Sequence, residues 1–421
     1  FPEIRALRSL RAAAGSTFSE ALVELTDGEG LPHARLLPVF GPLFGCWTRA
    51  RWLGHNLGRG AWSDKAEVQY QWLVRRAIRL ADDDNRFVLT PRDSPSTWSK
   101  TLFRTALELA GDEEDCAAAA AALGSGVVPT SAKFDRNDLP KPSLDSDWSA
   151  ISVLAGGWSR SAPRLAVSYA GSQVQIELTA RGERLFIGTW TTETECDGKP
   201  AQVAGEWENL CWQSDSDCDF LELSIPLSEG LRIERQLLLA RNDEVLYLAD
   251  LVISASGQAR RLKHALSLPL DEDAVWRPEA QTRDGVLRAG KLQAAVLPLA
   301  LPEWRIDPRG GALVEEHGRL VLTQESTGRA MCCPLFFDLK PTRARKERTW
   351  RQLTVAEWME VLPRDVAVGF RAQSGRAQWL FYRSLGPSGN RTVLGHNIAG
   401  EFCAGRFRSG KFEEWLEIEA V

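Results

Sequence analysis

The spacing of apolar residues along the chain changes near residue 127. Before this point apolar residues recur at helical spacing, and the clearest example begins at Asp64. Apolar side chains then fall at i, i+4, i+7, i+11 and i+14, at Ala66, Tyr70, Leu73, Ala77 and Leu80, while Lys65, Arg75, Arg76 and Arg79 lie largely elsewhere. This pattern predicts a helix with one buried face, in which Asp64 is the N-cap and Glu67 completes a capping-box-like pair.

Similar patterns predict further helices in the same part of the chain. They cover residues 17–26, 34–57 and 101–110, and another helix opens at Asp112 and ends near Gly124. Pro38 and Pro42 should bend or divide the helix over 34–57. Residues 127–147 contain three prolines among mostly polar residues and are predicted to be a linker. Residues 1–126 are therefore predicted to form an α-helical domain.

From Trp148 onward the apolar period is two. Apolar and polar residues alternate over 174–179 and 221–225, so each strand should have one dry face and one polar face. Longer apolar runs over 231–240 and 245–254 flank the polar residues 241–244, which predicts a β-hairpin. Strand-like runs recur over 366–372, 378–383 and 402–407. Residues 148–421 are predicted to form a large antiparallel β-sandwich, which makes the chain a multidomain α+β protein.

Charge and composition exclude several classes of protein. The formal net charge is −5, from 51 basic and 56 acidic side chains, so no global field would gather nucleic acid or an anionic membrane. The longest apolar stretch, around 292–301, is broken by Pro298 and is too short to span a bilayer, so we expect a soluble protein without membrane insertion. The chain begins Phe1-Pro2 without an apolar leader, and is expected to be either processed or read from an internal residue.

The cysteines and the acidic runs give no metal signature. Eight cysteines are scattered without a CxxC pair, which favours buried thiols, with a loop disulfide from Cys196 to Cys211 or Cys218 as the alternative. The acidic run over residues 215–219 contains Asp215, Asp217 and Asp219. It lacks the glycine and the distal glutamate of a calcium-binding EF-hand loop, which favours a solvated hairpin tip. No metal or other cofactor is predicted.

The stretch from Pro163 to Trp190, followed by the hairpin from Arg235 to Asp250, is similar to the heparinase II/III type of polysaccharide lyase. In that family the first stretch carries an HxHxD-like cluster before a strand, a turn and an acidic end. Here the corresponding positions hold Val167, Tyr169 and Gly171, with Trp190 near the acidic end. The resemblance implies a partial α/α toroid in front of the β-sandwich, and a periplasmic or extracellular location.

The resemblance also implies which residues would act. Removing the proton next to the carboxylate of an acidic sugar requires a base, an acid and a group that neutralises the carboxylate. The proton-transfer candidates are Tyr70, His55 and His264, and the neutralising candidates are Arg51 and Asn56. Each also has a structural interpretation: Tyr70 lies on the apolar stripe, His55 lies where a helix ends, and His264 lies in a strand-like segment.

A basic run and several tryptophans are candidates for sugar binding. Arg343, Arg345, Lys346 and Arg348 can pair with sulfate or carboxylate groups, although an exposed loop without a ligand has the same pattern. Trp62, Trp207 and Trp212 neighbour turn or polar residues and could stack on sugars. Two hypotheses result. The protein is either a lyase that cleaves an acidic polysaccharide by β-elimination, or a catalytically silent glycan- or protein-binding module of the same fold. Both hypotheses allow the protein to form a homo-oligomer.

Overall fold

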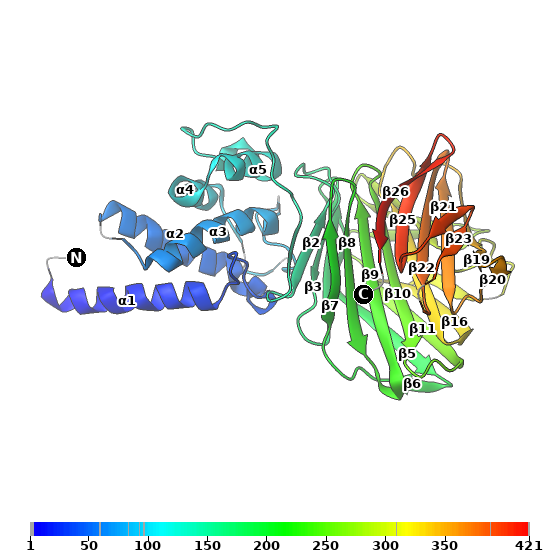
Figure 1. The fold of residues 1–421 in the computed structure, drawn as a ribbon. Coiled ribbons are helices and arrows are strands. Elements are labelled where there is room, and N and C mark those ends of the chain that lie inside the picture. The colour runs from blue at the N-terminus through cyan, green and yellow to red at the C-terminus, as the bar shows by residue number, and fades with distance from the viewer. Residues whose placement is uncertain are drawn as a thin grey trace. The chain divides into compact units, whose positions relative to one another are not determined.

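The computed structural model of the protein describes residues 4–419 except 59, 83, 92, 96, 309 and 388, and for residues 5–9 the backbone alone. The chain forms two compact units, each described separately below (Figure 1). The first contains residues up to Ala162 together with Ala166–Ala170, and the second contains Pro163–Leu165 together with residues from Gly171 onward. The α+β class is confirmed, because helices occupy the first unit and antiparallel strands fill the second.

The described part of the first unit contains five α-helices. They are α1 (Arg5–Glu24), α2 (Phe40–Asn56), α3 (Asp64–Leu80), α4 (Lys100–Ala110) and α5 (Glu113–Leu123), with 3-10 turns η1 (Ala34–Val39) and η2 (Ser125–Val127). The predicted division is confirmed at Pro38, which lies in η1 before α2 begins at Phe40, whereas Pro42 lies in the first turn of α2 and does not divide it. The predicted helix from Asp112 is confirmed as α5, and Asp112 caps it through a capping box with Asp115.

The predicted cap of α3 is wrong by one residue. The Ser63 hydroxyl accepts the backbone N–H of Ala66, and Asp64 is the first helical residue. Serine and aspartate both cap well, so two adjacent candidates cannot be separated by residue type. Glu67 does not complete a capping box, because its carboxylate binds Arg51 and Trp62 instead. The buried stripe of α3 is confirmed, with Tyr70 and Leu73 fully buried.

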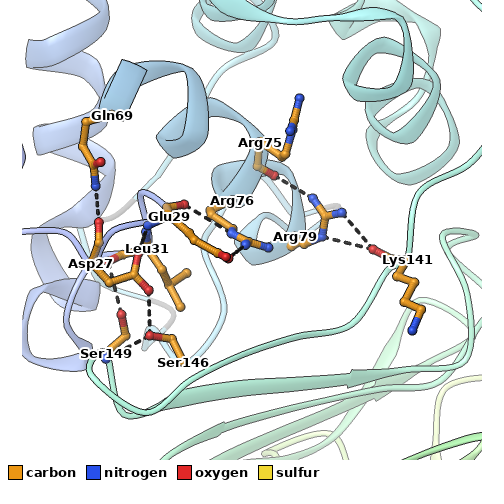
Figure 2. Close-up of polar contacts among 10 residues, drawn as sticks. All are labelled: Asp27, Glu29, Leu31, Gln69, Arg75, Arg76, Arg79, Lys141, Ser146 and Ser149. Atoms are coloured by element: carbon orange, nitrogen blue, oxygen red, sulfur yellow. Dashed lines mark hydrogen bonds and ion pairs between the residues drawn. The ribbon is translucent and has the colours of Figure 1, made fainter. Parts of the chain in front are cut away.

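Residues 127–147, expected to be a linker, lie within the first unit. Arg79 of α3 donates from Nε and from a terminal guanidinium nitrogen to the Lys141 carbonyl, at 3.1 and 2.9 Å (Figure 2). The Asp27 carboxylate accepts the Ser146 hydroxyl at 2.6 Å and the Leu31 N–H at 2.8 Å (Figure 2). These hydrogen bonds act together with Val127, Val128 and Leu144, which are buried in the core of this unit. The spacing of apolar residues in the sequence reveals neither kind of contact.

Short strands complete the first unit, and four groups of paired strands form the second. The strands β1 (Leu144–Ser146) and β2 (Ile151–Ala155) pair in the first unit, and β3 (Arg164–Ser168) carries residues of both. In the second unit the first sheet has the order β4 (Val174–Ala180), β5 (Glu183–Cys196), β11 (Arg260–Pro269), β16 (Arg319–Gly328) and β15 (Gly311–Glu316), with β6 (Lys199–Ala201) paired to β5. The second sheet has the order β12 (Val275–Pro278), β13 (Gly285–Ala289), β14 (Leu292–Pro298), β17 (Ala330–Asp338), β10 (Val245–Ser254), β9 (Leu231–Ala240), β8 (Cys218–Pro226) and β7 (Glu208–Ser214), and η3 (Ser228–Gly230) precedes β9.

Two further sheets follow in the chain. The third sheet has the order β18 (Arg348–Leu353), β21 (Ala367–Ser374), β22 (Ala377–Ser384), β25 (Phe402–Arg408) and β26 (Lys411–Ile418). The fourth consists of β20 (Glu360–Val361), β19 (Val355–Glu357), β23 (Arg391–Val393) and β24 (His396–Ile398). The predicted hairpin is confirmed, since β9 and β10 end and begin at the expected residues on either side of 241–244.

The second sheet is the middle layer of the second unit. Tyr247 on one face of β10 stacks on Phe381 of the third sheet, with ring centroids 4.6 Å apart. On the opposite face, Phe337 of β17 meets Phe186 of the first sheet at 5.6 Å. All ten residues of β10 are buried, which explains why this strand reads as a continuous apolar run rather than as an alternation.

The turn between β19 and β20 carries two bulky residues in a conformation that favours glycine and asparagine. Trp358 has φ 51° and Met359 has φ 68°, and they are 90% and 99% exposed. A two-residue turn of this kind suits Asn-Gly, because glycine has no Cβ to clash at positive φ and asparagine tolerates this region through local hydrogen bonds of its short side chain. The variant Trp358→Asn/Met359→Gly should therefore raise the free energy of unfolding by about 1 kcal/mol in urea titrations. Ser409→Asn, in a turn that already has Gly410, is the control and should change stability less. A lower free energy of unfolding for Trp358→Asn/Met359→Gly would contradict the claim that Trp358 and Met359 strain this turn.

Candidate functional site

Glu67 brings together two of the predicted residues at the corner of α2 and α3. The Nε of Arg51 lies 2.7 Å from the Glu67 carboxylate, and the indole N–H of Trp62 donates to the same carboxylate at 2.9 Å. The Trp62 ring also packs on Tyr70, with centroids 5.3 Å apart. The positive charge of Arg51 is therefore already paired within the protein.

Tyr70 lies in the core of the first unit. Its side chain is fully buried, and its hydroxyl donates to the Thr48 hydroxyl at 3.0 Å. Burial raises the pKa of the Tyr70 phenol well above its ordinary value, so the phenol stays protonated near neutral pH. His55 and Asn56 are exposed at the end of α2, where the Asn56 amide donates to the Trp52 carbonyl at 2.8 Å.

His264 belongs to a fully buried polar cluster in the second unit. Its Nε2 lies 3.1 Å from the Asp250 carboxylate, and its Nδ1 lies 2.9 Å from the Thr194 hydroxyl. Arg235 binds the same carboxylate with two nitrogens, at 2.7 and 2.9 Å. Burial acts to raise the pKa of Asp250, but Arg235 and His264 outweigh it and lower the pKa to about 2.

Two tryptophans stack on the arginine of this cluster. The guanidinium carbon of Arg235 lies 3.8 Å from the Trp190 ring centroid and 4.7 Å from that of Trp207. Trp207, a predicted sugar-binding residue, is thus buried and packs on Arg235, whereas Trp212 is half-buried on β7. Arg235 and Asp250 face each other in the β9–β10 register, so two charges in otherwise apolar runs were the signal for this cluster.

The basic run divides into paired and unpaired side chains. Arg343 binds Asp338 at 2.7 and 2.8 Å and stacks on Trp379. Arg348 binds Asp284 at 2.7 Å and Glu279 at 2.8 Å. These two guanidinium groups stabilise the loop and are not free for a ligand.

Arg345 and Lys346 line a cavity of about 410 Å³ together with Arg288 of β13. Among the described residues, none of these three cations has a carboxylate partner, and the Nε of Arg288 is buried without a hydrogen bond. We call this cavity the basic pocket. The described lining holds four cations, Arg288, Arg345, Lys346 and Arg348, against three carboxylates, Glu279, Asp284 and Glu347, so one positive charge is in excess. Arg288 was missed from the sequence because it is 57 positions before Arg345 and carries no motif.

The acidic run has a structural role in the described chain. Asp215 accepts the backbone N–H groups of Asp217 and Cys218, and Asp219 pairs with Arg241 at 2.6 Å. Within the residues that the structure describes, no group of three or more His, Cys, Asp or Glu side chains is arranged to hold a metal ion. All eight cysteines are free thiols, so the alternative disulfide from Cys196 is not formed. No helix in the described ranges is long and apolar enough to cross a membrane.

A helical unit followed by stacked antiparallel sheets with a buried charged cluster defines the class of fold. No protein-family model matches the sequence, and no curated protein matches it. Among solved structures, the chain is similar to the heparan sulfate lyase HepC from Pedobacter heparinus, with a TM-score of 0.62 and 12% identity over 92% of this chain and 64% of that one. It is also similar to the heparinase III BT4657 gene product, with a TM-score of 0.60 and 13% identity over 94% and 62% of the two chains.

A third solved structure, titled heparinase III, gives a TM-score of 0.59 at 10% identity over 91% of this chain and 65% of that one. The resemblance predicted from the sequence is confirmed, and the chain has the fold of the heparinase III and HepC lyases. The chain spans about two-thirds or slightly less of the length of these proteins. At this identity the likeness describes the fold, and function has to be argued from the sites.

Proposed function

We propose that this protein binds an acidic polysaccharide through the basic pocket and does not cleave it. The observation that carries the proposal is the set of three unpaired cations, Arg288, Arg345 and Lys346, around one cavity in a chain of net charge −5. Unpaired guanidinium and ammonium groups favour sulfate or carboxylate ligands. The fold supports a glycan as their source, since its structural relatives are named as heparin and heparan sulfate lyases.

The surroundings of two of the three proton-transfer candidates, Tyr70 and His264, support binding without cleavage, whereas His55 is exposed at the end of α2. A general acid or base must reach the proton that it transfers. Tyr70 and His264 are both fully buried, each in the core of its own unit, and each is hydrogen-bonded to protein groups. Arg51, a candidate neutraliser, is paired with Glu67. In this proposal the five helices are the end of the partial toroid that the family resemblance implies.

Charge reversal in the basic pocket tests the proposal. The variant Arg345→Glu/Lys346→Glu should weaken binding of heparin by roughly ten-fold or more, because two attractive contacts become repulsive. Binding should also weaken as salt is raised. Isothermal titration calorimetry with heparin, a polyuronate and neutral dextran measures both effects. The control Arg408→Glu/Lys411→Glu has the same charge change at an exposed turn and should bind like the unmodified protein.

Two outcomes would overturn this proposal. Equal weakening by both double variants would mean that only net charge matters. A rise in ultraviolet absorbance from unsaturated sugar ends, lost in Tyr70→Phe and His264→Ala, would favour the lyase hypothesis instead. The lyase is kept as the second candidate because its structural relatives carry that activity in their names.

A further inference from the structure

We propose that a groove between α2 and α4 is a second saccharide-binding site, which takes a single uronic acid unit. The ligand class rests on the proposed function, but the site uses other residues and lies wholly within the first unit. The groove has a volume of about 500 Å³, which is within the range of small-molecule sites. Its lining differs in kind from that of the basic pocket.

The floor of the groove is one stripe of α2 that lacks large side chains. Gly41, Gly45 and Thr48 follow at i, i+4 and i+7, and so lie on one face of the helix. A Cβ at Gly45 would lie 4.0 Å from Leu102 of α4, so alanine would fit without a clash. Glycine inside a helix costs stability relative to alanine. Since packing does not demand Gly45, its effect is to keep the groove open.

Trp52 provides an aromatic wall one turn beyond Thr48. Its side chain is 48% exposed although it lines the cavity, so a large apolar face is open to a ligand. A sugar ring presents an apolar face that can cover such an indole. Trp98 lines the cavity as well, but it is buried and its N–H donates to the Arg86 carbonyl at 2.9 Å. Trp52 is therefore the ring available for stacking.

The polar groups of the groove fit one negative charge and several hydroxyls. Arg49 is exposed, and no carboxylate among the lining residues or elsewhere in the described chain pairs with it. The hydroxyls of Thr97, Thr101 and Thr105 have no hydrogen-bond partner among the described residues. A guanidinium group and a row of hydroxyls match the carboxylate and hydroxyl groups of a uronate. A highly sulfated sugar fits the groove less well, because Arg49 is the one cation of its described lining whereas the basic pocket offers three unpaired cations.

Tyr70 contributes to this groove as a positioning residue. Its hydroxyl donates to the Thr48 hydroxyl, and Thr48 forms part of the floor. The Thr48 oxygen is therefore fixed from behind by a buried phenol. This arrangement places Tyr70 behind the floor of the groove, where it orients Thr48 without touching the ligand.

Titration with an unsulfated oligogalacturonate tests the groove. Trp52→Ala should weaken binding by roughly ten-fold, and Arg49→Gln should do so for the oligouronate but not for a neutral oligosaccharide. Trp148→Ala is the matched control, because Trp148 is 50% exposed in the same unit and does not line the groove. Gly45→Leu, checked for folding by circular dichroism, should block the groove by filling its floor, whereas Gly45→Ala should retain binding.

The groove and the basic pocket can fail separately. Absence of oligogalacturonate binding, or unchanged binding in Trp52→Ala and Gly45→Leu, would overturn the groove. If Arg345→Glu/Lys346→Glu then still weakens heparin binding, the proposed function stands without it. In the converse case, Trp52→Ala weakens oligouronate binding but Arg345→Glu/Lys346→Glu leaves heparin binding unchanged. That result would support the groove and reject the basic pocket.

Discussion

Replacing Arg235 by methionine should lower the free energy of unfolding by about 3–5 kcal/mol. The Arg235 guanidinium is buried, binds Asp250 with two nitrogens and contacts the rings of two tryptophans. Methionine fills a similar volume but leaves the Asp250 carboxylate buried with His264 as its remaining side-chain partner. An unpaired buried charge is far more costly than a lost surface ion pair. Urea unfolding followed by circular dichroism measures the loss.

The control is Arg261→Met, which removes an ion pair with Glu325 whose side chains are 73% and 54% exposed. It should cost less than about 1 kcal/mol. A loss of that small size for Arg235→Met would show that the buried cluster does not contribute to stability. The double variant Arg235→Met/Asp250→Leu should recover part of the loss, because no buried carboxylate then remains.

Acid titration checks the same cluster through Asp250. The pKa of this carboxyl is lowered to about 2 in the folded protein, below its ordinary value of 3.8. A lowered pKa contributes stability that is complete above the ordinary value and is lost as pH falls toward about 2. The contribution is roughly 2 kcal/mol. In Arg235→Met the lowering by Arg235 is gone, so this part of the acid sensitivity should shrink.

Much of the fold follows from local patterns in the sequence. The β9–β10 hairpin was predicted because four polar residues separate two long apolar runs, and the buried stripe of α3 was predicted from its 3.6-residue period. These signals lie within a single element or a single turn. The attachment of residues 127–147 was not predictable in this way, because the hydrogen bonds of Arg79 and Asp27 join segments 62 and 119 positions apart.

The candidate sites show the same limit. The sequence singled out Arg343 and Arg348 for a ligand, but Asp338 and Asp284 already bind them, and Asp284 is 64 positions away from Arg348. Charge runs report which groups are cationic and not which of them are paired. The sequence pointed to His264 but not to its partner Asp250. The two residues lie on strands of different sheets, β11 and β10, which are not hydrogen-bonded to each other, so strand pairing does not predict their contact.

Arg383→Met should also destabilise the second unit by about 3–5 kcal/mol, and the loss should depend on pH. Arg383 of the third sheet lies 3.0 Å from Glu222 and 2.7 Å from Glu234 of the second sheet, and all three are buried. Burial raises the pKa of Glu222, and Arg383 partly offsets this. A raised pKa gives stability at low pH that is lost as pH rises through it, and without Arg383 the pKa of Glu222 should rise further.

The loss measured in urea should therefore be larger at about pH 8 than at about pH 5. The control Lys263→Met removes an exposed ion pair and should cost less than about 1 kcal/mol at both pH values. Equal losses for Arg383→Met at the two pH values would mean that Arg383 does not lower the pKa of Glu222 in the folded protein.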